Sequence, residues 1–149
     1  MSRGWQRWAF DASGPRAAFV LRLVVGGIFV SEGLQKFLFP GELGVGRFLK
    51  IGIPMASAMA PFVGVVEIVC GLLLVLGLAT RVVCLPLLVN MAVAIASTKL
   101  LTFDKNGLWK TLHEARTDAL MIAGLLFLLA VGAGPLSVGG LSQGPRGRR

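Results

Sequence analysis

The chain has 149 residues, of which 55% are hydrophobic and 15% are charged, and its mean hydropathy is +0.79. Soluble domains carry about a quarter charged residues, so this composition excludes a soluble globular domain and predicts a membrane protein with about four spans. The formal net charge of +8 favours basic residues at a membrane surface over nucleic-acid binding, which would need a soluble basic domain.

Residues 1–16 form a short tail that is rich in arginine and aromatic residues. The rings of Trp5, Trp8 and Phe10 suit the headgroup region of a bilayer, where flanking arginines also lie. The alternative is a disordered tail. A cleaved signal peptide is disfavoured, because the apolar run that follows is longer than a typical signal sequence and no A-x-A-like site ends it.

The first predicted span covers residues 17–38. One stripe of this helix repeats at spacings of four and three residues, and its members are Arg22, Gly26, Phe29, Gly33 and Lys36. The glycines in the stripe permit close contact with a neighbouring helix. Glu32 and Lys36 are one helical turn apart and can pair along the helix. A plainer interpretation is that Arg22 and Lys36 extend to opposite membrane interfaces.

Residues 39–60 form a long connection that several prolines and glycines interrupt. Its mixture of apolar and basic residues predicts a short helix in the interface plane, with a re-entrant loop as the alternative. The second span is predicted over residues 62–79, where Glu67 is the single charged residue. A lone carboxylate in hydrocarbon is costly and needs a partner. Because Gly64 and Gly71 share its stripe, Glu67 is expected to face a neighbouring helix.

The third span is predicted over residues 82–101, with Asn90 near the bilayer centre as a hydrogen-bonding residue between helices. The fourth is predicted over residues 114–134. Its start is indicated by a Thr-Leu-His-Glu capping box at residues 111–114, and its end by two glycines. Residues 139–149 form a polar tail that is expected to be mobile. The sequence therefore predicts a single all-α membrane domain with four transmembrane helices in an antiparallel bundle.

Charged residues inside the spans gather at one end of the predicted bundle. With four spans both termini lie on one side, here called side A, and the second and fourth spans are entered from side B. Glu67 then lies roughly 7 Å inside side B, at 1.5 Å per residue. The other members of this predicted polar cluster lie at a similar depth or at the same boundary, and they are Glu32, Lys36, Glu114, Arg116 and Asp118.

Arg116 and Lys36 are the predicted partners of Glu67. The functional interpretation of the cluster is a polar cavity that opens toward side B under the 39–60 connection, and the structural interpretation is a charge network that fixes helix register. Arg22, Arg81 and Asn90 are secondary candidates, the two arginines approaching from side A. The basic flank of the first span favours cytoplasmic termini.

The chain contains two cysteines and one histidine, and no CxxC pair. A thioredoxin-like motif is therefore absent, and the chain alone cannot hold a haem between two histidines or form a histidine-rich metal site. No metal site is predicted, and no complete catalytic or redox-cofactor motif is present, which leaves enzymatic activity open. Cys70 and Cys84 are expected at different depths and without a disulfide between them.

Four segments resemble the DoxX family of small four-helix membrane proteins. They are LRLVVGGIFVSEGLQK at residues 21–36, EIVCGLLLVLGLATR at residues 67–81, NMAVA in the third span and EARTDALM at the start of the fourth. The similarity extends over residues 17–138. It implies a four-helix integral membrane protein and draws attention to Arg22, Lys36, Glu67 and Arg81 without assigning them catalytic roles. The family includes subunits linked to thiosulfate–quinone oxidoreduction and to membrane complexes that handle thiol and oxidative stress.

The resemblance favours a membrane subunit of a redox-linked complex, associated with thiol or sulfur chemistry or with a quinone, and with a soluble or membrane oxidoreductase as partner. Quinone is implied by the resemblance alone. The alternatives are a small transporter or channel component that uses the embedded acids, and a structural or assembly scaffold without activity of its own. The expected environment is the lipid bilayer of a bacterial inner membrane, and a homo-oligomer is also compatible with the sequence.

Overall fold

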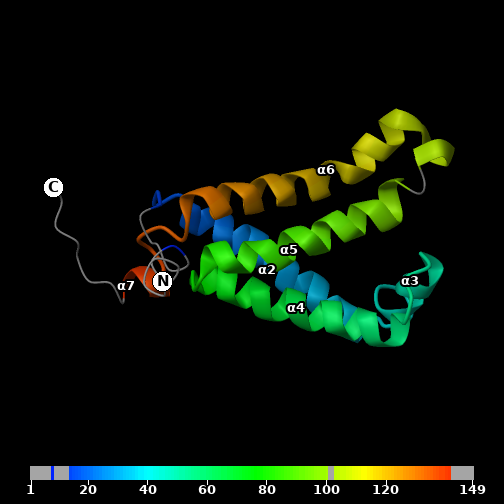
Figure 1. Cartoon of the computed structure of the whole chain (residues 1–149), viewed down its shortest axis with the longest axis horizontal. Coiled ribbons are helices and arrows are strands. Elements are labelled where there is room, and N and C mark those ends of the chain that lie inside the picture. The colour runs from blue at the N-terminus through cyan, green and yellow to red at the C-terminus, as the bar shows by residue number, and fades with distance from the viewer. Residues whose placement is uncertain (1–7, 9–13, 101–102, 142–149) are drawn as a thin grey trace.

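The computed structural model describes residue 8, residues 14–100 and residues 103–141, and the regular structure in these residues is helical, without strands. The long helices are α2 (Ala18–Leu38), α4 (Ala56–Leu76), α5 (Thr80–Ile95) and α6 (Phe103–Val131). The short ones are α3 (Val45–Lys50), the π-helix η1 (Ala96–Leu100) and α7 (Val138–Leu141). The long helices lie side by side along the long axis of the molecule, with α3 at one end and α7 at the other (Figure 1).

Among the residues that the structure describes, three segments are long and apolar enough to cross a membrane: Ala18–Leu38, Ala56–Leu76 and Thr80–Lys99. The third comprises α5 and most of η1. Within the described residues this confirms an all-helical protein with membrane-spanning helices. Of the predicted N-terminal tail, residues 1–7 and 9–13, including Trp5 and Phe10, lie outside the described residues, as do residues 142–149 of the predicted C-terminal tail.

The second span begins earlier than predicted. α4 starts at Ala56, and Pro61 lies inside the helix instead of before it. Pro61 is the sixth residue of α4, in its second turn. Because proline has no N–H, the hydrogen bond to the carbonyl of Ser57 is lost, and the helix nevertheless continues to Leu76.

The predicted start of the fourth helix at the 111–114 capping box is wrong. α6 extends from Phe103 to Val131, and its one non-helical position is Gly107, with φ 71° and ψ 168°. The positive φ is accessible to glycine without strain, so the break occurs there and Thr111 lies within the helix. The predicted C-terminal end is close to the observed one, because Gly132 follows Val131 with φ 83°.

The end of the third span is a π-helix, which the sequence analysis did not anticipate. The hydroxyl of Ser97 donates to the carbonyl of Val93 over 2.7 Å, and the hydroxyl of Thr98 donates to that of Ala94 over 2.5 Å. Hydroxyls that bond back to the preceding turn compete with the helical backbone ladder. Such π segments occur frequently at functional sites.

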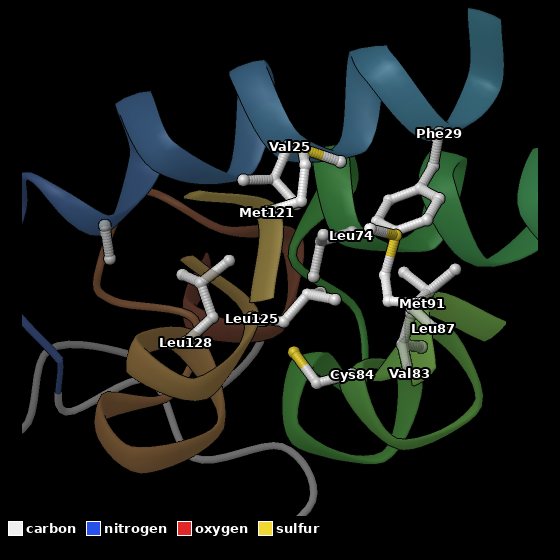
Figure 2. Close-up of a cluster of buried hydrophobic side chains, with 11 residues drawn as sticks. Val25, Phe29, Leu74, Val83, Cys84, Leu87, Met91, Met121, Leu125 and Leu128 are labelled. Carbon is white, nitrogen blue, oxygen red and sulfur yellow. The ribbon is translucent and has the colours of Figure 1, made fainter. Parts of the chain in front are cut away.

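The hydrophobic core lies between α2, α4, α5 and α6, as Figure 2 shows. α2 and α4 approach closely at two glycine pairs, as their stripes predicted. A Cβ atom added to Gly26 would lie 2.7 Å from the carbonyl oxygen of Gly71, and one added to Gly33 would lie 2.6 Å from that of Gly64. Any larger residue at these positions would push the two helices apart.

Candidate functional site

Lys36 of α2 and Glu67 of α4 form an ion pair, with 2.6 Å between Nζ and Oε2. Asn90 of α5 donates from Nδ2 to the second carboxylate oxygen, Oε1, over 2.7 Å. Glu67 is 4% exposed, and each of its oxygens therefore has a donor inside the protein. One carboxylate joins three helices, and we call Lys36, Glu67 and Asn90 the polar triad.

The packing of α2 on α4 positions the ion pair. Gly33 lies one turn before Lys36, and a Cβ atom there would be 3.1 Å from the Cβ of Glu67. The backbone of α2 can approach Glu67 only because that Cβ is absent. Lys36 then turns inward, and its Nζ also donates to the carbonyl oxygen of Glu32 over 3.4 Å.

The triad is energetically sensitive because it is buried. Burying a carboxylate without partners is very unfavourable, and removal of one member of a buried pair typically costs about 3–5 kcal/mol because the other charge loses its compensation. The side chains of Lys36 and Glu67 are 11% and 6% exposed. This arrangement can fix the register of α2 on α4, and it can also present hydrogen-bonding groups to a ligand.

A cavity of about 590 Å³ lies against the triad. Its walls come from α2, the 39–60 connection, α4, α5, η1 and α6. The apolar part of the lining includes Phe29, Phe48, Met59, Met91 and Met121, and the polar part outside the triad comprises Glu32, Arg47, Ser97, Thr98, Thr117 and Asp118. Largely apolar walls with a few converging polar groups, and a volume of this order, are typical of small-molecule sites.

The 39–60 connection supplies one wall of the cavity through α3. Phe48 is buried against Ala56 and Ala60 at the start of α4. This contact holds α3 over the α2–α4 pair, so the predicted short helix does lie beside the predicted polar residues. α3 exposes Leu49 on the opposite side.

The structure divides the predicted polar cluster. Lys36 and Glu67 are in direct contact, and Glu32 and Asp118 line the same cavity. Glu114 lies elsewhere, 3.9 Å from the Nζ of Lys99. Arg116 is exposed, with its Nη1 3.3 Å from Nδ1 of His113, so Lys36 and not Arg116 is the partner of Glu67.

The secondary candidates also separate. Asn90 belongs to the triad. Arg22 is completely buried, and Lys36 is held by Glu67, so neither side chain extends freely away from the protein as the plainer interpretation expects. Arg81 lies over the ring of Trp8 at 5.7 Å and donates from Nη2 to the carbonyl oxygen of Ala130 over 3.0 Å.

Sequence reasoning missed several lining residues. Arg47 was treated as part of an interfacial helix, and Ser97 and Thr98 were not connected with the charged residues. A signal for the two hydroxyl residues was present, because adjacent serine and threonine near the end of an apolar span favour bonds to the preceding turn. The methionine lining had no distinctive signal, since methionine is common in apolar spans.

Within the part of the chain that the structure describes, no group of three His, Cys, Asp or Glu side chains is placed to hold a metal ion. Cys70 and Cys84 are both free thiols. The polar chemistry of the site therefore comes from an ammonium group, carboxylates, an amide, a guanidinium and hydroxyls.

The sequence is similar to one protein family and to known proteins from two bacteria. The DoxX family model matches residues 17–100. The "Uncharacterized membrane protein Rv3486" of Mycobacterium tuberculosis is 49% identical over 140 residues, which cover 90% of this chain and 85% of that protein. The "Putative oxidoreductase CatD" of Bacillus subtilis is 34% identical over 112 residues, covering 70% of this chain and 81% of that protein. No solved structure matches the chain.

Proposed function

The chain belongs to the DoxX family of integral membrane proteins, and from this premise we propose that it is the membrane subunit of a redox-linked complex whose cavity binds a quinone-type compound. The observation that carries the proposal is the cavity of about 590 Å³ with the polar triad in its wall. The name of the Bacillus subtilis relative, an oxidoreductase, supports a redox context.

The lining fits a quinone in both size and chemistry. A quinone has a flat ring with carbonyl acceptors and an apolar tail. Phe29, Phe48 and several methionines offer aromatic and thioether surfaces of the kind that pack against flat rings. Lys36 and Arg47 carry N–H donors for the carbonyl oxygens. When bound, a quinone would supply two-electron, two-proton acceptor chemistry.

The chain's own residues bind the ligand, orient it and hold protons. The ammonium of Lys36 has three donors, and its contacts with Glu67 and with the Glu32 carbonyl use two of them. The third is available to a ligand in the cavity. Asn90 holds the carboxylate of Glu67 in place through the second oxygen, so the orientation of Lys36 is set by the neighbouring helices.

A partner oxidoreductase, soluble or membrane-bound, would supply the electrons. We further propose that α6 crosses the bilayer as a fourth span in an antiparallel bundle, with its apolar part at residues 119–131. Met121, Leu125 and Leu128 bury one face of it in the common core (Figure 2). The proposed location is a bacterial inner membrane, with both termini on the cytoplasmic side.

Equilibrium binding of a short-chain quinone to the purified protein in detergent tests the proposal. We expect saturable binding that Lys36→Gln weakens at least tenfold. Lys50→Gln is the matched control, because Lys50 is exposed and lies outside the cavity lining. Binding that is absent, or equal in all three proteins, would refute the quinone site. Co-purification in mild detergent tests the partner separately, and a recurring oxidoreductase is the expected result.

Transport is the second candidate, because Glu32, Glu67 and Asp118 all line one cavity and embedded acids are common in ion and proton pathways. Purified protein in liposomes distinguishes the two. Proton or solute flux without quinone binding would favour transport. If the protein shows neither quinone binding nor flux, the scaffold interpretation remains, in which the triad serves only to fix helix register.

A further inference from the structure

At the opposite end of the bundle, a buried arginine has no counter-charge among the residues that the structure describes. Arg22 lies in the second turn of α2 and is 0% exposed. One of its N–H groups, on Nη2, donates to the carbonyl oxygen of Leu136, while Nε and Nη1 have no acceptor. Among the described acidic side chains, Glu67 pairs with Lys36 and Glu114 pairs with Lys99, and none pairs with Arg22.

Burial of the Arg22 guanidinium without a counter-charge is unfavourable in free energy. Arginine keeps its charge in proteins, and an uncompensated buried charge costs several kcal/mol. The face of the guanidinium lies over the ring of Phe19 at 5.7 Å, which offers a weak cation–π contact but no acceptor for the N–H groups on the edges. The guanidinium therefore needs an acceptor that the described chain does not supply.

The guanidinium lies against the turn between α4 and α5, and the residue that follows this turn carries a second polar atom without a partner. The Nη1 group lies directly against Gly77, where φ is 71° and a Cβ atom would collide with that nitrogen. Gly77 begins the short turn that leads into α5, whose first residue is Thr80. Thr80 is 1% exposed, and its Oγ1 also has no hydrogen-bond partner. The backbone N–H groups in the first turn of a helix such as α5 have no intrahelical acceptor, and the helix dipole gives that end a partial positive charge.

We infer that Arg22, Thr80 and the N-terminus of α5 form a site for a phosphate-type oxyanion. Arginine binds phosphate oxygens through several N–H groups at once, and helix N-termini bind the same group. Arg22 lies four residues into α2, or about 6 Å along its axis, which is the depth of a headgroup boundary if Ala18 lies at the membrane surface. The oxyanion can come from a phospholipid headgroup or from free phosphate. This site is independent of the quinone cavity.

Access to the site involves the segment after α6. Leu136 and Ser137 cover Arg22, and the segment begins with Gly132 and Gly134, whose φ values are 83° and 75°. Ser137 is buried, and its hydroxyl makes two hydrogen bonds within this segment. It donates to the carbonyl oxygen of Gly134 and accepts from the backbone N–H of Gly140. Because Arg22 is 0% exposed, an anion can reach it only if this segment moves.

Thermal unfolding of the purified full-length protein in a maltoside detergent tests the inference. Sodium phosphate is compared with sodium chloride at equal ionic strength, and phosphatidylglycerol is compared with no added lipid. We expect a saturable rise in Tm with one of the two phosphate sources, and an apparent affinity at least tenfold weaker in Arg22→Gln. Arg16→Gln is the matched control, because Arg16 is exposed beside the start of α2, and it should respond like the parent.

The two arms identify the source of the anion. A response to inorganic phosphate assigns a free anion, and a response to phosphatidylglycerol alone assigns a lipid headgroup. If Arg22→Gln does not fold, Thr80→Val keeps the shape of the side chain and should weaken the response of the parent. The inference is overturned if the parent responds to neither source, or if the variants that fold respond as the parent does.

Discussion

Substitution of Lys36 by methionine provides a stringent test of the buried ion pair. Lys36→Met keeps most of the side-chain volume and removes the ammonium that lies 2.6 Å from Glu67. Asn90 then remains as the one described donor to the carboxylate, because the other described donor to Glu67 is Lys36. Breaking a buried pair in this way costs about 3–5 kcal/mol. For a chain of this length that corresponds to a fall in Tm of roughly 6–20 °C.

A double-mutant cycle separates the charge from the packing. Glu67→Leu should also destabilise, but Lys36→Met together with Glu67→Leu removes both charges and should recover much of the loss. Thermal unfolding in detergent measures all four proteins, with Lys50→Met as an exposed control. Additive losses in the double variant, or single variants within about 2 °C of the parent, would contradict the pair described here.

Three further predictions follow from the packing and topology. Gly71→Leu should lower Tm markedly, because a Cβ atom there would lie 2.8 Å from the carbonyl oxygen of Gly26. Gly27→Leu is the control and should leave Tm nearly unchanged, because a Cβ atom at Gly27 would have nothing within 4 Å. Equal effects of the two variants on Tm would refute the close α2–α4 contact. Reporter fusions after residue 145 and within residues 102–110 should report opposite sides of the membrane, and a shared side would rule out a fourth span. Non-reducing mass spectrometry should find the two cysteines unbridged, and a disulfide would overturn the α4–α5 pairing.

The contact between α2 and α4 was predictable from sequence because it depends on small residues at regular spacing. Gly26 and Gly33 repeat seven residues apart on α2, as do Gly64 and Gly71 on α4, and helices with such matching stripes can approach closely. The same stripes carry Lys36 and Glu67, which is why Lys36 was among the predicted partners.

The choice between Lys36 and Arg116 required the rotation of α6, which the sequence does not specify. Met121 faces the core. Arg116 lies five residues before it, or about 140° around a helix with 3.6 residues per turn, and so faces outward. Asp118 lies about 60° from Met121 by the same measure and reaches the cavity. The phase of α6 follows from its tertiary packing, so no local pattern could have selected between the two bases.

The bond from Asn90 to Glu67 was not predicted for a related reason. The rotation of α5 relative to α4 depends on the turn between them, where Gly77 and Ala79 both have positive φ, 71° and 47°. Glycine marks such a position in a sequence, but a positive φ at alanine is unusual and leaves no signature. Asn90 could be placed near the bilayer centre but not in contact with a particular residue.

The central claim is that the cavity beside the polar triad holds a quinone-type ligand, and photo-crosslinking tests it most directly. A photoreactive quinone is irradiated with the purified protein, and the modified peptides are mapped by mass spectrometry. We predict adducts at cavity residues such as Met59, Met91 and Met121, suppressed by excess unlabelled quinone and by Ala94→Phe, which narrows the cavity. Adducts confined to lipid-facing side chains such as Val20 and Val24, or labelling that excess quinone does not reduce, would contradict the claim.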